Sequence, residues 1–321
     1  MAIVQTDIPI TSELCTGYIQ KIVETYPFCR TEVLTETAFG RPVQALIIGS
    51  GERKTLFTAA HHANEWITAL VLLKFVEELA EAIANDRELY GIPGRVIDRN
   101  CTIYTVPMVD PDGVDLVTGE ILPGTVQYET ARLLASFYPQ IPFPDGWKAN
   151  LLGVDLNLQY PAGWLQAREI KFSQGYTRPG PRDYVGRAPL NQRESAALAE
   201  YTEVIDPALV LAYHTQGREI YWQYDDILVP GARALAEEFA RLSGYTVSDV
   251  PYESGFAGYK DWFIKTFRRP GFTIEAGSGT NPLPLEQFDQ IYKDNLGILT
   301  TAALGLPEAE PRDGESEENA P

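Results

Sequence analysis

The 321-residue chain is predicted to fold as an α/β sandwich around a mostly parallel sheet. Short apolar runs typical of buried strands alternate with longer stretches in which apolar residues recur at helical spacing. Several of the strand-like runs end in polar residues, as strands do at the ligand-binding edge of an open α/β sheet. The alternation continues without an internal repeat or a linker, so we expect one domain over residues 1–306. Residues 307–321 are rich in Pro and Glu and are predicted to be a disordered acidic tail.

The elements are expected in the following order. A first helix begins after Thr11 or Ser12, either of which can cap its amino end, and Pro27 ends it. Strands are expected over residues 31–37, 43–48, 56–60, 101–109, 153–157, 208–214, 219–224 and 272–275. Further helices are expected over residues 66–84, 129–137, 192–204, 230–243 and 285–304. Asp110-Pro-Asp-Gly113 is interpreted as a turn, and residues 160–189 are predicted to form a loop.

Composition narrows the classes of protein to which this chain can belong. The net charge of −18 argues against nucleic acid or an anionic membrane surface as a partner. The three cysteines are odd in number and lack C-x-x-C spacing, so neither a disulfide framework nor a cysteine zinc site is expected. The sequence shows no signal-peptide pattern and no apolar run of membrane-spanning length, so we expect a cytoplasmic protein.

The most informative stretch lies between residues 55 and 68. An apolar strand-like run stops at His61-His62, Glu65 follows three residues later, and helical spacing begins at Trp66. An imidazole and a carboxylate at such a turn can bind one zinc ion, which in catalytic sites has three protein ligands and a water. The alternatives are a simple polar contact for His62 and a favourable charge in the first turn of a helix for Glu65. His61 is expected to pack outside such a site.

Three other predicted strands also end in polar residues, namely Asn157, His214 and Glu275. The carboxyl ends of parallel strands share one edge of a sheet, so these side chains could converge with His62. Zinc held by His62, Glu65 and His214 would lower the pKa of a bound water towards about 7. Glu275 could then take the proton of that water and pass it to a leaving amine. The alternative for Glu275 is an exposed carboxylate at the end of a strand.

Five ordered segments resemble the zinc metallocarboxypeptidase family over roughly residues 11–305. They are His62-Ala-Asn-Glu65-Trp66-Ile-Thr, Asp110-Pro-Asp-Gly113, Gly153-Val-Asp-Leu-Asn157, His214-Thr-Gln and Thr273-Ile-Glu275. The resemblance implies a three-layer α/β/α sandwich around a mixed, mostly parallel sheet of eight strands. It also implies a zinc peptidase with one zinc per chain on His62, Glu65 and His214, and with Glu275 as general acid/base.

The departures from the family bear on the substrate. Carboxypeptidases of the family carry an arginine after the aspartate-leucine-asparagine segment, where it binds the terminal carboxylate of the substrate. In this chain Leu158 follows Asn157, and leucine cannot make that charge-assisted contact. The substrate tyrosine of the family is expected to be replaced by Ile264.

Two further family arginines are replaced. Asn64 stands between the His and Glu ligands, and Lys148 follows Trp147 where the family has its oxyanion arginine. Lys148 could stabilise an oxyanion as a point charge, and a surface lysine is the alternative.

One branch of the family resembles this chain further, through residues 155–162, 181–186, 258–262 and 279–284. This branch comprises the bacterial γ-D-glutamyl-L-diamino acid endopeptidases, which cut the γ-D-glutamyl–meso-diaminopimelate bond of peptidoglycan stem peptides. The resemblance implies a metalloprotease that recycles murein peptides in the cytoplasm. The alternatives are a carboxypeptidase of ordinary peptides and a pseudoenzyme that binds peptides without cutting them.

Substrate contacts are expected from Asn64, Lys148 and Asn157. The free amino and carboxyl groups of the diaminopimelate end require further partners, and a guanidinium suits a carboxylate. The candidates are Arg178, Arg182, Arg187 and Arg218, with solvated loop arginines as the alternative for each. The sequence does not fix the oligomeric state.

Overall fold

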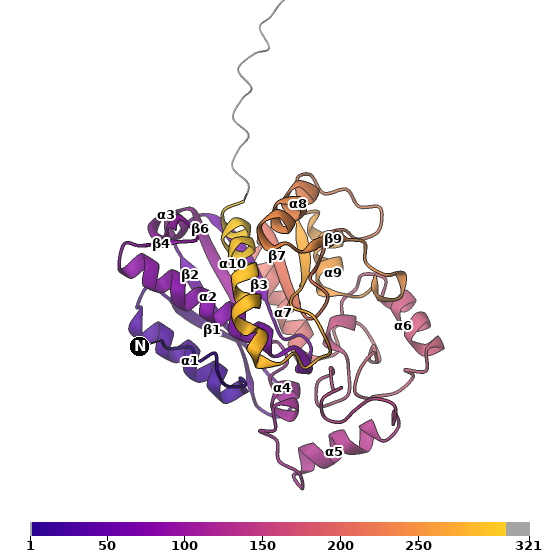
Figure 1. The fold of residues 1–321 in the computed structure, drawn as a ribbon. Helices are drawn as coiled ribbons and strands as arrows, with labels where there is room; N and C mark the ends of the chain where they lie inside the picture. Colours follow the sequence, from indigo (N-terminus) through magenta and orange to yellow (C-terminus); the bar gives the residue numbers. More distant parts are fainter. Residues whose placement is uncertain (1, 306–321) are drawn as a thin grey trace, which may run out of the picture.

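The computed structural model describes residues 2–305 (Figure 1), so the expected tail at 307–321 lies outside the described residues. A mixed eight-stranded sheet forms the centre, with the strand order β1-β2-β6-β3-β7-β10-β8-β9. The strands are β1 (Arg30–Glu36), β2 (Pro42–Gly49), β3 (Arg53–Thr58), β6 (Cys101–Val106), β7 (Leu209–His214), β8 (Glu219–Tyr221), β9 (Thr246–Ser248) and β10 (Gly271–Glu275). The four central strands β6, β3, β7 and β10 are parallel to one another. β2 runs antiparallel to both β1 and β6, and β8 runs antiparallel to β10 but parallel to the edge strand β9. The predicted mixed, mostly parallel sheet is confirmed.

Helices cover both faces of this sheet. They are α1 (Ser12–Thr25), α2 (Ile67–Ala84), α3 (Gly94–Asn100), α4 (Pro111–Val117), α5 (Val126–Ala135), α6 (Trp164–Ser173), α7 (Arg193–Ile205), α8 (Ala232–Ser243), α9 (Tyr259–Phe267) and α10 (Phe288–Leu304). A small hairpin of β4 (Glu88–Leu89) and β5 (Ile92–Pro93) follows α2. Among residues 2–305, no helix combines the length and the apolar character needed to cross a bilayer.

Two buried clusters on opposite faces of the sheet create the three layers. Side chains alternate along each strand, so Phe57 of β3 belongs to the buried cluster that includes residues of α1, α2, α8 and α10, whereas its neighbour Leu56 belongs to the cluster that includes residues of α7 and α9. Helix α2 is buried almost all round because α1, α3 and α10 pack against it in addition to the sheet. The α/β/α sandwich is therefore confirmed.

Local side-chain bonds explain several element boundaries. Thr11 is the cap of α1, as one of the two alternatives predicted, because its Oγ1 accepts a hydrogen bond from Leu14 N at 3.2 Å. The interpretation of residues 110–113 as a simple turn was wrong. Asp110 caps the short helix α4, and its Oδ1 accepts a hydrogen bond from Gly113 N at 3.0 Å.

The loop region next to the sheet also differs from the prediction. Residues 153–157 form no strand, because Asp155 Oδ1 accepts from Asn157 N at 3.1 Å and starts the 3-10 turn Leu156–Leu158. The predicted loop at 160–189 contains α6, whose weak amphipathic pattern hid it in the sequence. Helix α9 was not predicted either, and its first turn lies beside Asn157. These segments form one wall of the site described next.

Candidate active site and metal centre

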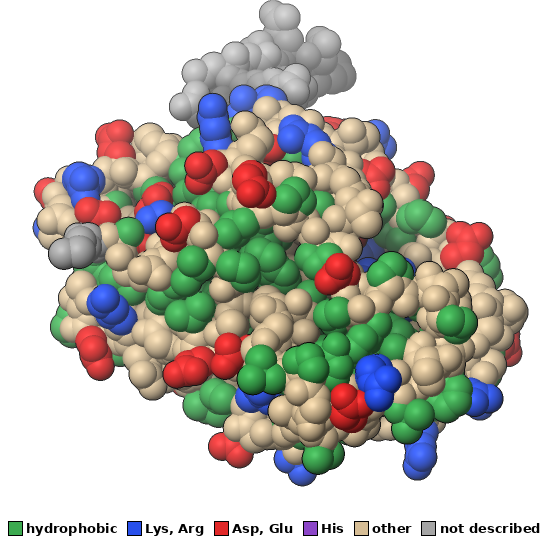
Figure 2. Space-filling model, turned by 60° about the horizontal axis from the view of Figure 1, so that its bottom comes forward, with side chains coloured by type: hydrophobic (Ala, Val, Ile, Leu, Met, Phe, Trp, Pro, Cys, Tyr) green, Lys and Arg blue, Asp and Glu red, His purple; other side chains and the backbone are tan. Residues whose placement is uncertain are grey.

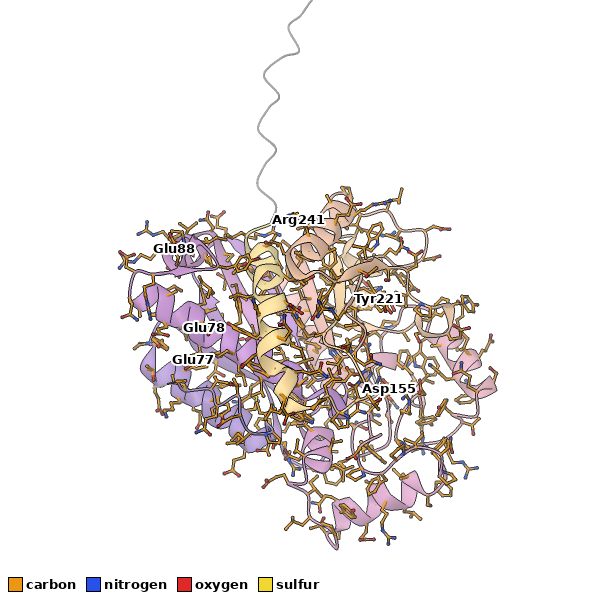
Figure 3. All side chains as sticks on the ribbon, viewed as in Figure 1. Glu77, Glu78, Glu88, Asp155, Tyr221 and Arg241 are labelled. Carbon is orange, nitrogen blue, oxygen red and sulfur yellow. The ribbon has the colours of Figure 1, made fainter. Side chains whose placement is uncertain are left out.

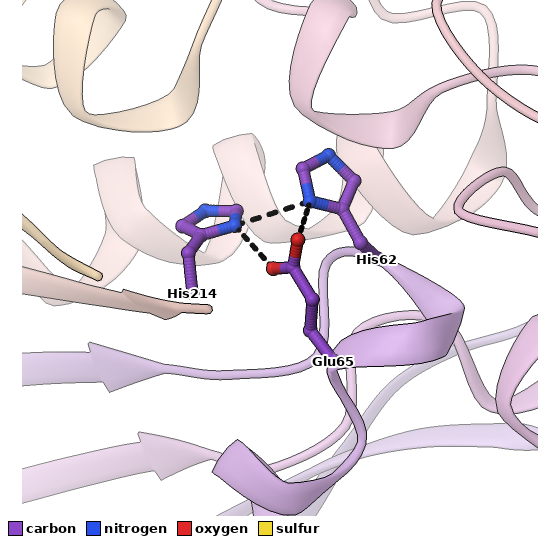
Figure 4. Close-up of side chains that lie close together, drawn as sticks. All are labelled: His62, Glu65 and His214. Carbon is purple, nitrogen blue, oxygen red and sulfur yellow. Dashed lines mark hydrogen bonds and ion pairs between the residues drawn. The ribbon is translucent and has the colours of Figure 1, made fainter. Parts of the chain in front are cut away.

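Three side chains meet at the carboxyl edge of the central strands (Figure 4). His62 Nδ1 lies 2.9 Å from Glu65 Oε1 and 3.2 Å from His214 Nδ1, and His214 Nδ1 lies 2.8 Å from Glu65 Oε2. One ligand atom of each residue lies within 4.8 Å of the others, and all three residues are buried. The structure thus brings together the three side chains that the sequence singled out, which we call the metal triad.

The sheet explains why these residues meet. β3 and β7 are parallel neighbours, so the turn after β3, which carries His62, lies next to His214, the last residue of β7. A 3-10 turn, Ala63–Glu65, then leads into α2. Thr68 fixes this turn, because its Oγ1 donates to Glu65 O at 2.7 Å and accepts from Ala60 N at 3.1 Å. His61 lies outside the triad and stacks on His214, as expected.

Outer partners hold the two imidazole rings. His62 Nε2 lies 3.1 Å from Asp155 Oδ1, which leaves its Nδ1 facing the triad. His214 Nε2 lies 3.4 Å from Asn157 Nδ2, and Asn157 Oδ1 accepts from Tyr259 N at 3.0 Å. Sequence reasoning gave Asp155 no role of its own, although it lies in a segment that carries the family resemblance.

The electrostatics of the triad fit a cation. Burial disfavours a charged Glu65, but His62, Lys148 and His214 outweigh it and hold the pKa of Glu65 well below its usual range. Burial also opposes protonation of His62, yet the Glu65 carboxylate raises the pKa of His62 to about 9. A buried carboxylate that faces two imidazole nitrogens therefore attracts positive charge. Two imidazoles and a carboxylate are also a donor set that zinc accepts, so the residues fit the metal.

Glu275 is the last residue of β10 and pairs in register with His214 on β7. Its side chain lines the same cavity as the triad. Burial and the negative charge of Glu65 raise the pKa of Glu275 to about 8. A carboxyl group that titrates near neutral pH can both take and give a proton, as a general acid/base must.

The triad opens into a cavity of about 890 Å³. Four of the residues predicted to contact substrate line it, namely Asn64, Lys148, Asn157 and Arg182. Lys148 is no surface lysine, because its Nζ lies 3.0 Å from Glu65 Oε1. Asp155 and Tyr221, labelled in Figure 3, line the cavity as well. In Figure 2 acidic and basic side chains are interspersed over the face shown, and basic side chains are visible inside a hollow in it.

Several predicted substrate residues lie elsewhere. Arg218 is outside the cavity lining, because its guanidinium donates to Asp294 at 2.8 Å and stacks on the ring of Tyr245. Neither Arg178 nor Arg187 lines the cavity. The placement of Ile264 at a substrate-binding position was also wrong. It is fully buried against the sheet, on the side of α9 that faces the core.

Two ion pairs in the cavity wall were not expected from the sequence. Lys260 Nζ lies 2.5 Å from Asp261 Oδ1, in the first turn of α9. Lys171 Nζ lies 2.7 Å from Asp183 Oδ1. The indication in the sequence that these four residues line a cavity was only weak, because isolated charged residues in loops and in helices that are not predicted usually face solvent.

Comparison with known proteins identifies the family. The family model for zinc carboxypeptidases (peptidase M14) matches residues 15–297. The chain therefore belongs to the zinc carboxypeptidase family, and it is accordingly a metallopeptidase, a hydrolase.

Two curated relatives cover most of the chain. Gamma-D-glutamyl-L-diamino acid endopeptidase 1 of Lysinibacillus sphaericus is 41% identical over 281 residues, which are 88% of this chain and 69% of the relative. The uncharacterized protein YqgT of Bacillus subtilis (strain 168) is 37% identical over 287 residues, 88% of this chain and 74% of the relative.

Solved structures show the same fold at low identity. Bovine thrombin-activatable fibrinolysis inhibitor superposes with a TM-score of 0.70 at 15% identity, covering 93% of this chain and 97% of its own. Murein-tripeptide amidase MpaA of Escherichia coli O157 superposes with a TM-score of 0.54 at 18% identity, covering 87% and 93%.

Proposed function

We propose that this protein is a zinc-dependent peptidase that hydrolyses the γ-D-glutamyl–meso-diaminopimelate bond of peptidoglycan stem peptides. The observation that carries this proposal is the 41% identity, over 88% of the chain, to a relative named for that specificity. The metal triad and Glu275 supply the machinery that such a reaction needs. No nucleic acid or membrane surface takes part in it.

His62, Glu65 and His214 would hold one zinc ion per chain. One ligand atom of each residue lies within 4.8 Å of the others, and Asp155 fixes the tautomer of His62 from outside. When bound, zinc acts as a Lewis acid that polarises a carbonyl and lowers the pKa of water towards about 7.

The side chains of the protein handle the protons and the developing charge. Glu275 takes a proton from the attacking water and delivers it to the leaving amine nitrogen. Its raised pKa, about 8, suits both steps near neutral pH. Lys148, partly buried in the cavity beside Glu65, places a positive charge where the carbonyl oxygen becomes negative.

Leu158, which follows Asn157 in the wall of the cavity, favours this reaction over removal of ordinary C-terminal residues. Leu158 lines the cavity but packs among Trp164, Ala167 and Val185, and it offers no donor to a terminal carboxylate. Ile264, the second residue that the sequence analysis linked to the choice of substrate, cannot contact a substrate because it lies in the core. The proposed preference for the γ-D-glutamyl bond is therefore supported by Leu158 and by the identity to the relative named for that specificity.

We also propose that the protein acts in the cytoplasm on peptides released from the wall, so that it recycles murein. The three cysteines are buried and free, which fits a reducing compartment. Fractionation of cells followed by immunodetection tests this location, and recovery outside the cytoplasm contradicts it.

The deciding experiment offers the zinc-loaded protein the tripeptide L-Ala-γ-D-Glu-meso-diaminopimelate and, separately, a hippuryl amino acid. We expect release of diaminopimelate from the tripeptide, detected by mass spectrometry, and little hydrolysis of the hippuryl substrate. A chelator should abolish the release, and added zinc should restore it. Preference for the hippuryl substrate contradicts the proposal and supports an ordinary carboxypeptidase.

A further inference from the structure

A guanidinium is held in a fixed place on the cavity wall. Arg182 lines the cavity, and its Nε donates to Asp183 Oδ2 at 2.6 Å. The other oxygen of Asp183 lies 2.7 Å from Lys171 Nζ, so these three side chains carry one net positive charge. Among residues 2–305, no group accepts a hydrogen bond from the two terminal nitrogens of Arg182. A forked pair of donors is thus left for an anion, and this is the geometry that binds a carboxylate with two parallel bonds.

A chain of contacts places this guanidinium relative to the metal triad. The backbone N–H of Asp183 donates to Asp155 Oδ2 at 3.2 Å, and Asp155 Oδ1 lies 3.1 Å from His62 Nε2. Arg182 therefore lies on the His62 side of the triad. Glu275 lies on the other side, because it pairs with His214 on the adjacent strand.

The position of Glu275 sets the direction in which a substrate lies. A general acid must be within reach of the leaving nitrogen, so the leaving residue occupies the Glu275 side of the triad. The acyl residue then occupies the side of Lys148 and Arg182. In a γ-linked glutamyl peptide the acyl residue retains its own α-carboxylate, whereas an α-linked peptide carries no charged group at that atom.

We propose that Arg182 binds the α-carboxylate of the glutamyl residue and so selects γ-linked substrates, an inference that rests on the proposed function. Lys171 and Asp183 act as positioning residues that hold the guanidinium in place. Arg182 thus binds the acyl residue of the substrate. The sequence analysis had instead named it as a candidate for binding the diaminopimelate end. A salt bridge that merely stabilised the loop would leave the choice of substrate untouched.

The test compares two tripeptides that differ in one group. The first is L-Ala-γ-D-Glu-meso-diaminopimelate, and the second carries a carboxamide in place of the glutamyl α-carboxylate. The wild-type zinc enzyme should cleave the first with a kcat/KM about 10- to 100-fold higher, as expected for hydrogen bonds to a charged group. Arg182→Gln should bring the two values close together by slowing cleavage of the carboxylate peptide alone. Arg182→Lys, which keeps the charge but loses the fork, should give an intermediate ratio.

Arg187→Gln is the matched control, because Arg187 is an exposed arginine of the same segment that does not line the cavity. It should keep the wild-type ratio. Equal cleavage of the two peptides by the wild type overturns this inference and leaves the proposed function standing. An equal loss on both peptides in Arg182→Gln, with Arg182→Lys behaving like the wild type, assigns Arg182 a structural role and overturns it too. Failure of the wild type to cleave either peptide overturns the proposed function itself.

Discussion

His214 and Glu275 are the last residues of two adjacent parallel strands and lie opposite each other in the register of the sheet. The backbone also joins the strands at this point, because Ala276 N donates to His214 O at 2.8 Å. The sheet, rather than a mobile loop, therefore fixes the distance between a metal-triad residue and the proposed acid/base.

Glu275→Gln should remove the proton-transfer step and leave the site otherwise intact. Because general acid–base catalysis contributes about 10²–10⁴-fold, we expect kcat to fall by that factor. Zinc content and the thermal midpoint should stay near the wild-type values. Glu219→Gln is the control, since Glu219 pairs with Glu275 across β8 and β10 but does not line the cavity. Undiminished cleavage by Glu275→Gln would remove this residue from its role.

His214→Ala should lose zinc and activity together. The fold should persist, because the sheet and its two buried clusters do not depend on this side chain. Elemental analysis of the purified protein should give one zinc per wild-type chain and little in the variant. A circular dichroism spectrum like that of the wild type shows that the fold is retained. Full zinc occupancy in the variant would count against His214 as a ligand.

Asp155→Asn should weaken zinc binding without displacing a ligand. Asp155 contacts both His62 Nε2 and Asp183 N, and loss of such an outer partner typically costs 10- to 100-fold in metal affinity. Competition with a chromogenic chelator measures that affinity. Asp145→Asn removes a cavity-wall charge that does not contact His62, and it should bind zinc like the wild type. Equal affinities for both variants would show that the Asp155 contact is not needed.

Sequence reasoning located the metal triad because two strand-like runs each led to a histidine. The ends of parallel strands meet at one edge, so periodicity alone was enough to group His62, His214 and Glu275. The same reasoning failed where side chains override local patterns. Asp155 caps the 3-10 turn Leu156–Leu158, so residues 153–157 form no strand, although their sequence resembles a short one.

The direction in which a side chain points was harder to predict than the place of its residue in the fold. Arg218 adopts a left-handed backbone conformation with φ +57, which sends its side chain towards Asp294 on α10. No pattern in the sequence indicates that conformation for an arginine. Ile264 was placed at the position of the family's substrate tyrosine from its spacing after Asp261-Trp262, and because helix α9 was not predicted, its inward face could not be identified.

Asp110 offers a test of the pH dependence of stability away from the triad. Its Oδ1 caps α4, whereas its buried Oδ2 has no hydrogen-bond partner among residues 2–305. Burial and the nearby negative charge of Glu194 raise the pKa of Asp110 well above its ordinary value of 3.8. An acid with a raised pKa in the folded state contributes stability below its unfolded pKa. That contribution is lost as the pH rises through the folded pKa.

Asp110→Asn keeps the capping oxygen and removes the ionisable group, so it should be more stable than the wild type at pH 8. We expect a thermal midpoint higher by about 2–4 °C, and the difference should shrink as the pH is lowered towards 5. Urea unfolding of the zinc-loaded protein at several pH values gives the same comparison as a free energy of unfolding. Asp112→Asn is the contrasting variant, because Asp112 pairs with Arg41 at 2.8 Å and its loss should destabilise the protein. An Asp110→Asn protein that is less stable than the wild type at pH 8 would show that the Asp110 carboxylate is needed in its charged form.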